Sequence, residues 1–155
     1  MSAAPTPRPY VVPIYKVSLV RDGRLATAQP QLRCSADAAE LFRAFLGNVD
    51  REHFMVAMLD RKHRLIGTNL VHVGTIDGAL VNPRDVFKPA LLCNAVAIVL
   101  CHNHPSGDCQ PSREDRTLTQ RLKDAGKLLD VTVLDHIILG DGTNQYLSFA
   151  DENFL

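Results

Sequence analysis

The run from Ala95 to Cys101 constrains the fold of this chain more than any other segment, because it carries no charged or strongly polar side chain. A strand that faces water on one side alternates apolar and polar residues, whereas a strand without this alternation must be covered on both faces. The run therefore predicts a strand at the centre of a sheet, with other elements packed on each side.

The rest of the chain alternates between helical and strand patterns. Apolar residues at helical spacing predict three helices: Ser35–Gly47 with Ser35 as N-cap, Asn82–Asn94 with Pro83 in its first turn, and Thr117–Leu129. Further strands are expected at Tyr15–Val20, ending in an Asp22-Gly23 turn, and at Phe54–Leu59, Leu65–Val73 and Val131–Leu139. This alternation is typical of an α/β domain with a central sheet and flanking helices.

The length of 155 residues and the hydrophobic content of 46% suit one domain with one continuous core. Four prolines lie within residues 1–13, which we interpret as a flexible Pro-rich leader. Residues 14–155 are predicted to form a single domain, with a strand and a helix in residues 14–48 and the motif-bearing core in residues 50–155.

Seventeen basic and seventeen acidic side chains cancel, so the net charge does not indicate a nucleic-acid partner. No apolar run approaches the roughly 20 residues needed to span a bilayer, so we expect no membrane association. The four cysteines show no Cys-x-x-Cys spacing, and the N-terminus lacks a signal-peptide pattern. These features favour a reducing, cytoplasmic location.

The chemistry is concentrated where the central strand ends. His102 and His104 are separated by one residue, so on an extended chain their side chains point the same way. Catalytic zinc sites typically have three protein ligands and a water. Asp115 follows a loop that contains Pro105 and Gly107, and it lies where the next helix could return it to the two imidazoles.

Two simpler interpretations stay open on these residues alone. The histidines could be surface imidazoles at a loop entrance. Ser112 and Asp115 also have the spacing of a capping box, with Ser112 as N-cap of the following helix. Capping and metal binding are compatible, because a helix that begins at the site would hold both side chains still.

His102, His104, Ser112 and Asp115 also match a family pattern: histidine, one residue, histidine, seven residues, serine, two residues, aspartate. With this match the chain, from about Asp50 onward, resembles the RadC family of JAB/MPN domains, which carry a JAMM motif like that of zinc metalloproteases. The resemblance extends to Val73–Thr75, Asn82–Lys88, Leu118–Thr119 and Leu134–Ile138. It implies a three-layer, cytidine-deaminase-like α/β fold with a mixed sheet, and a Zn²⁺ ion on His102, His104 and Asp115.

The resemblance further implies a metallopeptidase or isopeptidase that uses a metal-activated water. Glu52 then corresponds to the family's general base, and Ser112 to the residue that binds the developing oxyanion. By itself Glu52 would be taken for a solvated charge, and Glu40 is a weaker candidate. Asp135 and His136 interrupt an apolar strand, so they either support the site or form a satisfied core pair.

The alternative is a non-catalytic module that keeps the zinc site and serves DNA repair or protein interaction. Residues before Glu52 are expected to form leader, strand and helix, without the helix-hairpin-helix domain that many RadC-type proteins carry, which weakens a DNA-binding role. A zinc deaminase would need His-x-Glu and Pro-Cys-x-x-Cys motifs, which are absent from the sequence. Asn103 replaces the Ser or Thr of many deubiquitinating members, so the substrate, expected to be a protein or peptide, stays unnamed, as does the oligomeric state.

Overall fold

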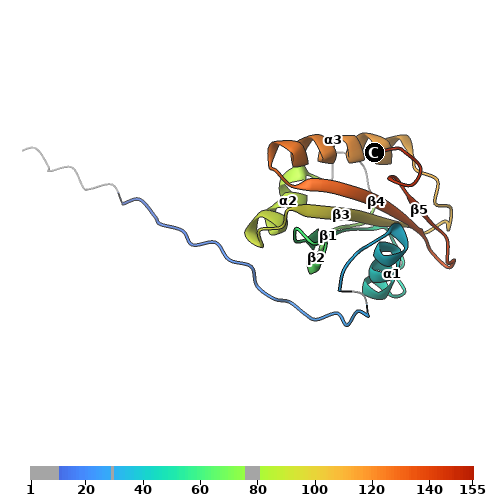
Figure 1. The fold of residues 1–155 in the computed structure, drawn as a ribbon, viewed down its shortest axis with the longest axis horizontal. Helices are drawn as coiled ribbons and strands as arrows, with labels where there is room; N and C mark the ends of the chain where they lie inside the picture. The colour runs from blue at the N-terminus through green and yellow to red at the C-terminus, as the bar shows by residue number, and fades with distance from the viewer. Residues whose placement is uncertain (1–10, 29, 76–80) are drawn as a thin grey trace, which may run out of the picture.

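The computed structural model describes residues 11–28, 30–75 and 81–155, which form a mixed sheet with helices on both faces (Figure 1). The element order is α1 (Ser35–Leu46), β1 (His53–Leu59), β2 (Leu65–Val73), α2 (Pro83–Leu92), β3 (Ala97–His104), α3 (Arg113–Leu128), β4 (Thr132–Gly140) and β5 (Tyr146–Ser148). The predicted α/β class is confirmed.

The five strands lie in the order β2-β1-β3-β4-β5. The β1–β2, β1–β3 and β4–β5 pairs are antiparallel, and β3 and β4 are parallel, joined by α3. A parallel pair needs a crossover connection, which α3 supplies. The apolar run that starts at Ala95 thus contributes the middle strand of the sheet, as its composition predicts.

Each face of the sheet has its own core. Alternate side chains of β1 and β3, including Phe54, Val56 and Leu100, pack against α2 and α3. The intervening side chains, including Met55 and Val99, pack against α1. Because side chains of a strand alternate between faces, every second residue of β3 continues toward the α3 side.

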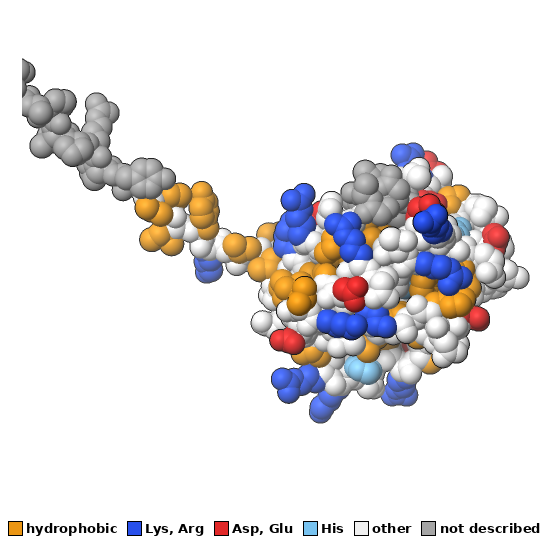
Figure 2. All heavy atoms as spheres, turned by 90° about the horizontal axis from the view of Figure 1, so that it is seen from above, with side chains coloured by type: hydrophobic (Ala, Val, Ile, Leu, Met, Phe, Trp, Pro, Cys, Tyr) orange, Lys and Arg blue, Asp and Glu red, His pale blue; other side chains and the backbone are white. Residues whose placement is uncertain are grey.

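The predicted strand at Tyr15–Val20 is wrong. Residues 11–27 form neither helix nor strand, and Tyr15 and Val20 are 82% and 87% exposed. This segment projects from the body of the molecule with its apolar side chains uncovered (Figure 2). A strand needs a hydrogen-bonded neighbour, and no pairing with this segment occurs among the described residues. Residues 1–10 of the expected leader lie outside the described residues.

The starts of two helices also differ from the predictions. Helix α1 begins at Ser35 itself, with Cys34 at the N-cap, and the Ser35 hydroxyl donates to Asp151 at 2.6 Å. Helix α3 begins at Arg113 rather than Thr117, because the capping residue Ser112 starts it earlier.

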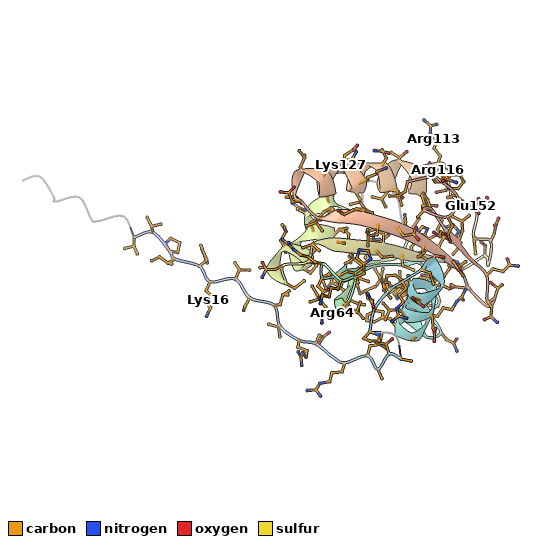
Figure 3. The ribbon with its side chains drawn as sticks, in the orientation of Figure 1. Lys16, Arg64, Arg113, Arg116, Lys127 and Glu152 are labelled. Carbon is orange, nitrogen blue, oxygen red and sulfur yellow. The ribbon has the colours of Figure 1, made fainter. Side chains whose placement is uncertain are left out.

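The C-terminal segment closes over the start of α3. The Arg116 guanidinium lies 3.9 Å from the centre of the Phe154 ring, and the Phe154 amide donates to the Phe149 carbonyl. Figure 3 shows Arg113 and Arg116 at this end of α3, with Glu152 on the neighbouring segment. None of the helices in the described part of the chain is long and apolar enough to cross a bilayer.

Candidate metal centre

The two histidines lie at the carboxyl end of β3, on the face covered by α3. The strand continues past the predicted end at Cys101 as far as His104, because His104 pairs in register with Gly140 of β4. His102 is 1% exposed, and it follows Leu100 on the α3 face of the sheet. His104 is the next residue on that face, so both rings project toward the start of α3.

The loop after β3 orients the His104 ring. Gly107 has a φ of +81°, a left-handed conformation that favours glycine, and its amide donates to the His104 carbonyl. The turn presents the Asp108 carbonyl 2.7 Å from Nδ1 of His104. A carbonyl only accepts, so Nδ1 carries the proton, and the Nε2 lone pair of a neutral His104 faces the site.

Asp115 is held at the start of α3 by a reciprocal capping box. The Asp115 amide donates to Oγ of Ser112 at 3.0 Å, and the Ser112 amide donates to Oδ2 of Asp115 at 2.7 Å. The predicted capping box is therefore present. It fixes the carboxylate near the positive end of the helix with Oδ1 directed at His102.

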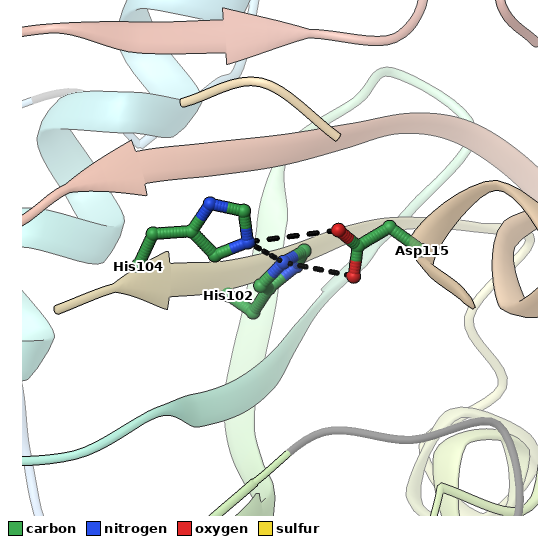
Figure 4. Close-up of side chains that lie close together, drawn as sticks. All are labelled: His102, His104 and Asp115. Atoms are coloured by element: carbon green, nitrogen blue, oxygen red, sulfur yellow. Dashed lines mark hydrogen bonds and ion pairs between the residues drawn. The ribbon is translucent and has the colours of Figure 1, made fainter. Parts of the chain in front are cut away.

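The three side chains converge at one point (Figure 4). Nε2 of His102 lies 2.9 Å from Nε2 of His104 and 3.2 Å from Oδ1 of Asp115, and Nε2 of His104 lies 3.6 Å from Oδ2 of Asp115. Zinc bonds of 2.0–2.2 Å in tetrahedral geometry separate neighbouring ligand atoms by about 3.3 Å. The observed distances bracket that value, so the donor set and its spacing fit a zinc ion.

Across residues 11–28, 30–75 and 81–155, this is the one group of three or more His, Cys, Asp or Glu that could hold a metal ion, and its ligand atoms lie within 4.8 Å of one another. Cys101 is buried on the opposite face among the α1 core residues, and burial raises its pKa well above the usual range. Cys101 therefore cannot join His102 and His104 as a ligand of the same metal ion.

Asp115 and the two histidines shift one another's pKa values. Burial by itself raises the pKa of Asp115, but its close contacts with His102, His104 and Ser112 outweigh that effect and hold the pKa far below its usual range. The Asp115 carboxylate in turn raises the pKa of His104 above 6.5, against the opposing effect of burial. The Asp108 carbonyl and the negative charge of Glu52 add to this increase. An ionised carboxylate is thus ready to bind a cation.

Glu52 lies immediately before β1, where its backbone is fixed on both sides. The Asn103 side chain accepts from the His53 amide at 2.7 Å and donates to the Arg51 carbonyl at 3.1 Å. The Glu52 carbonyl accepts from the Gly74 amide. The negative charge of Glu52 is near enough to His104 to contribute to the raised pKa of that imidazole. Glu40, by contrast, lies exposed on α1.

Ser112 is an exposed residue at the N-cap of α3. Its Oγ is the acceptor in the bond from the Asp115 amide, and in this bond the hydroxyl keeps its own hydrogen. Capping therefore does not exclude a contact between this hydroxyl and a substrate.

His136 and Asp135 have different partners. Nε2 of His136 lies 2.8 Å from Nδ1 of His102, so this fully buried ring touches a metal-ligand candidate. Asp135 accepts from the Ser148 hydroxyl and the Ala150 amide and ties β4 to the segment after β5. Of the two predicted roles, support of the site fits His136 and a satisfied core contact fits Asp135.

Sequence reasoning missed two side chains that hold the site. Thr119 lies one turn after Asp115 and 2.6 Å from Nδ1 of His136. Asn103, noted only as a variation of the motif, anchors the backbone around Glu52. A threonine one helical turn from a ligand candidate is a detectable signal, since residues four apart share a helix face.

The match between this chain and known families is specific. Residues 32–154 match the profile of the RadC-like JAB domain. The chain belongs to the RadC-like JAB domain family. Its relatives include a UPF0758 protein of Rubrobacter xylanophilus, which is 44% identical over 127 residues, and one of Vibrio cholerae, which is 46% identical over 119 residues.

These alignments cover 82% and 77% of this chain, and 55% and 73% of the two relatives. A UPF0758 protein of Histophilus somni is 48% identical over 110 residues, which are 71% of this chain and 49% of the relative. The chain thus spans about half the length of the Rubrobacter and Histophilus proteins.

Proposed function

We propose that this protein is a zinc-dependent metallohydrolase of the RadC type that cleaves an amide or isopeptide bond in a protein or peptide. The observation that supports it most is the convergence of His102, His104 and Asp115 within 4.8 Å. In this proposal the three side chains hold Zn²⁺. When bound, zinc lowers the pKa of a coordinated water from 15.7 to about 7, which makes hydroxide available at neutral pH.

The chain's own residues would then move the proton and hold the substrate. The Glu52 carboxylate accepts the proton of the water that attacks the scissile carbonyl carbon, and it later donates that proton to the leaving amine nitrogen. The Ser112 hydroxyl donates to the carbonyl oxygen as that oxygen gains negative charge. The backbone bonds from Asn103 and Gly74 keep Glu52 from drifting away from this position.

Two further features belong to the proposal as well. The kinship of the fold to cytidine deaminases is an inference from the family, whereas a cytoplasmic location is inferred from the cysteines and the N-terminal sequence. Free cysteines at 34, 93, 101 and 109 suit a reducing compartment.

Metal content tests the first step. Native protein is expected to carry about one zinc per chain by elemental analysis, and His104→Ala none. His63→Asn is the matched control, because His63 is an exposed histidine in the turn between β1 and β2 and Asn tolerates its positive φ of 56°. Equal zinc in native protein and His104→Ala would remove the proposed site.

Cleavage tests the second step. In a screen of peptide and isopeptide substrates, Glu52→Gln should retain zinc and lose at least about 100-fold in rate, the scale of a general base. Glu40→Gln, an exposed glutamate on α1, should cleave like the native protein. Native-like cleavage by Glu52→Gln would show that Glu52 is not the base. Zinc binding without cleavage of any substrate in the screen would favour the non-catalytic module.

A further inference from the structure

We infer that Thr119 and His136 are positioning residues that fix His102 in the one tautomer able to bind a metal ion through Nε2. The inference rests on the proposed metal site for its consequence, but the tautomer itself is a property of the metal-free protein. A row of hydrogen bonds leads from the backbone carbonyl of Asp115 through Thr119 and His136 to His102, whose ring faces the Asp115 carboxylate.

The row begins at the Thr119 hydroxyl. This hydroxyl has one hydrogen, which it donates to the Asp115 backbone carbonyl at 2.6 Å. A carbonyl has no hydrogen to give back, so the direction of this bond is fixed. Oγ1 of Thr119 also lies 2.6 Å from Nδ1 of His136, and with its own hydrogen committed it accepts there. Nδ1 of His136 therefore carries a proton.

The direction of the Thr119 hydrogen bond determines the tautomer of His136. This ring is fully buried, and it packs against Phe54 and Phe149 with ring centroids 5.5 Å and 4.9 Å apart. An apolar enclosure of this kind disfavours the charged imidazolium, so the His136 ring is neutral. A neutral ring protonated on Nδ1 has its lone pair on Nε2.

The last bond determines His102. Nε2 of His136 lies 2.8 Å from Nδ1 of His102, so Nδ1 of His102 is the donor. Its Nε2 is then a bare lone pair that faces Nε2 of His104 and Oδ1 of Asp115. With every bond reversed, Nε2 of His102 would hold a proton and repel a cation. Only the tautomer of His102 that is protonated on Nδ1 can therefore bind a metal ion together with His104 and Asp115.

A second imidazole is an unusual orienting partner for a metal-binding histidine. Such histidines generally donate to a carboxylate, a backbone carbonyl or water, which accept regardless of protonation. A neutral imidazole accepts or donates depending on its own tautomer. Thr119 removes this ambiguity, because it links His136 to the backbone of the same helix turn that supplies Asp115.

The tautomers can be measured directly in metal-free protein by long-range ¹H–¹⁵N correlation of the imidazole rings at pH 8. In native protein we expect His102, His104 and His136 all to be protonated on Nδ1. In Thr119→Val, which keeps the side-chain shape without the hydroxyl, the signals of His136 and His102 should shift toward the Nε2-protonated form. A native His102 protonated on Nε2 would overturn the inference without any variant.

Zinc affinity, measured by competition with a chromogenic chelator, gives the second readout. Thr119→Val should bind zinc about 10–100-fold more weakly, as is typical when an orienting partner is lost. Thr119→Ser, which restores the hydroxyl, should bind within about threefold of native protein. Thr117→Val is the matched control, because the exposed Thr117 also donates to the carbonyl four residues earlier on α3. It should leave affinity and tautomers unchanged.

The two hypotheses fail in different ways. Native protein that binds no zinc would overturn the proposed function, while its tautomers would still test this inference. Zinc binding by Thr119→Val at native affinity, with unchanged tautomers, would overturn the inference and leave the proposed function standing. The melting temperature of each metal-free variant distinguishes a lost tautomer from a lost fold.

Discussion

Asn103 connects the segment of the proposed base, Glu52, to β3, the strand that carries the two histidine ligand candidates. Its side chain is fully buried on the face opposite the two histidines, where it makes three hydrogen bonds: with the His53 amide, the Arg51 carbonyl and the Asp141 carboxylate. Two of these bonds flank Glu52. Asn103 therefore fixes the backbone that carries Glu52 relative to β3.

We predict that Asn103→Ala lowers the free energy of unfolding by about 2–4 kcal/mol, because it removes three part-buried hydrogen bonds at about 0.5–1.5 kcal/mol each. Urea denaturation of metal-free protein measures this loss. Zinc content should remain about one per chain, since the metal-ligand candidates lie on the other face. Asn144→Ala, at an exposed asparagine, is the control and should change stability by less than about 0.5 kcal/mol. Native-like stability of Asn103→Ala would show that the hydrogen bonds of the Asn103 side chain do not contribute to the free energy of unfolding.

Single residues were predictable where local spacing determines geometry. The i, i+2 spacing places His102 and His104 on one face, and the i, i+3 spacing of Ser112 and Asp115 gives a capping box. The roles of Asn103 and His136 depend on partners 50 and 34 residues away. Such contacts form only when the strands pair, so the local sequence pattern does not predict them.

At the level of elements, the loop after β3 depends on a glycine in β4. A Cβ on Gly140 would run into the carbonyl of Gly107 and approach Sγ of Cys109 at 3.0 Å. The loop from Pro105 to Pro111 can lie this close to β4 because no side chain stands there. This packing keeps the Asp108 carbonyl in place to orient His104.

Gly140→Ala is predicted to displace this loop. The expected cost is about 1–3 kcal/mol in the free energy of unfolding, the scale of overpacking, together with weaker zinc binding because His104 loses its orienting carbonyl. Gly67→Ala is the control, since a Cβ at this strand position meets only Cε of Met58 at 3.5 Å. Chemical denaturation and chelator competition measure the two effects. Native-like zinc affinity in Gly140→Ala would show that the loop tolerates the added methyl group.

Elements with a strong pattern and a covered face were predictable, and the others were not. β3 and the β1–β2 hairpin follow from apolar runs bounded by polar residues. The Tyr15–Val20 segment has a strand-like composition, but it has no neighbour among the described residues to pair with. β5 was missed because its three residues, Tyr146–Ser148, are too few to show a period and form a strand only through pairing with β4.

At the level of the whole molecule, the candidate site exists only when the sheet and α3 are assembled. His102 and His104 come from β3, Asp115 from α3, and the orienting His136 from β4. An unfolded chain cannot bring these groups together with the same geometry. Zinc should therefore bind the folded state in preference and stabilise it.

We predict that zinc raises the melting temperature, and that the increase is larger at pH 8 than at pH 6. A free concentration 1,000 times the dissociation constant stabilises the folded state by about 4 kcal/mol. Zinc needs a neutral imidazole, and Asp115 raises the pKa of His104 above 6.5, so protons compete strongly at pH 6 and weakly above the raised pKa. Without zinc the sign is opposite. A raised pKa stabilises the fold below the ordinary pKa of His, and this contribution is lost as the pH rises through the raised value.

Calorimetry of the protein with zinc or with a chelator, at pH 6 and at pH 8, measures the difference. His63→Asn should behave like native protein, and His104→Ala should show no zinc effect. A zinc effect that is equal at both pH values would contradict the competition between zinc and protons for His104.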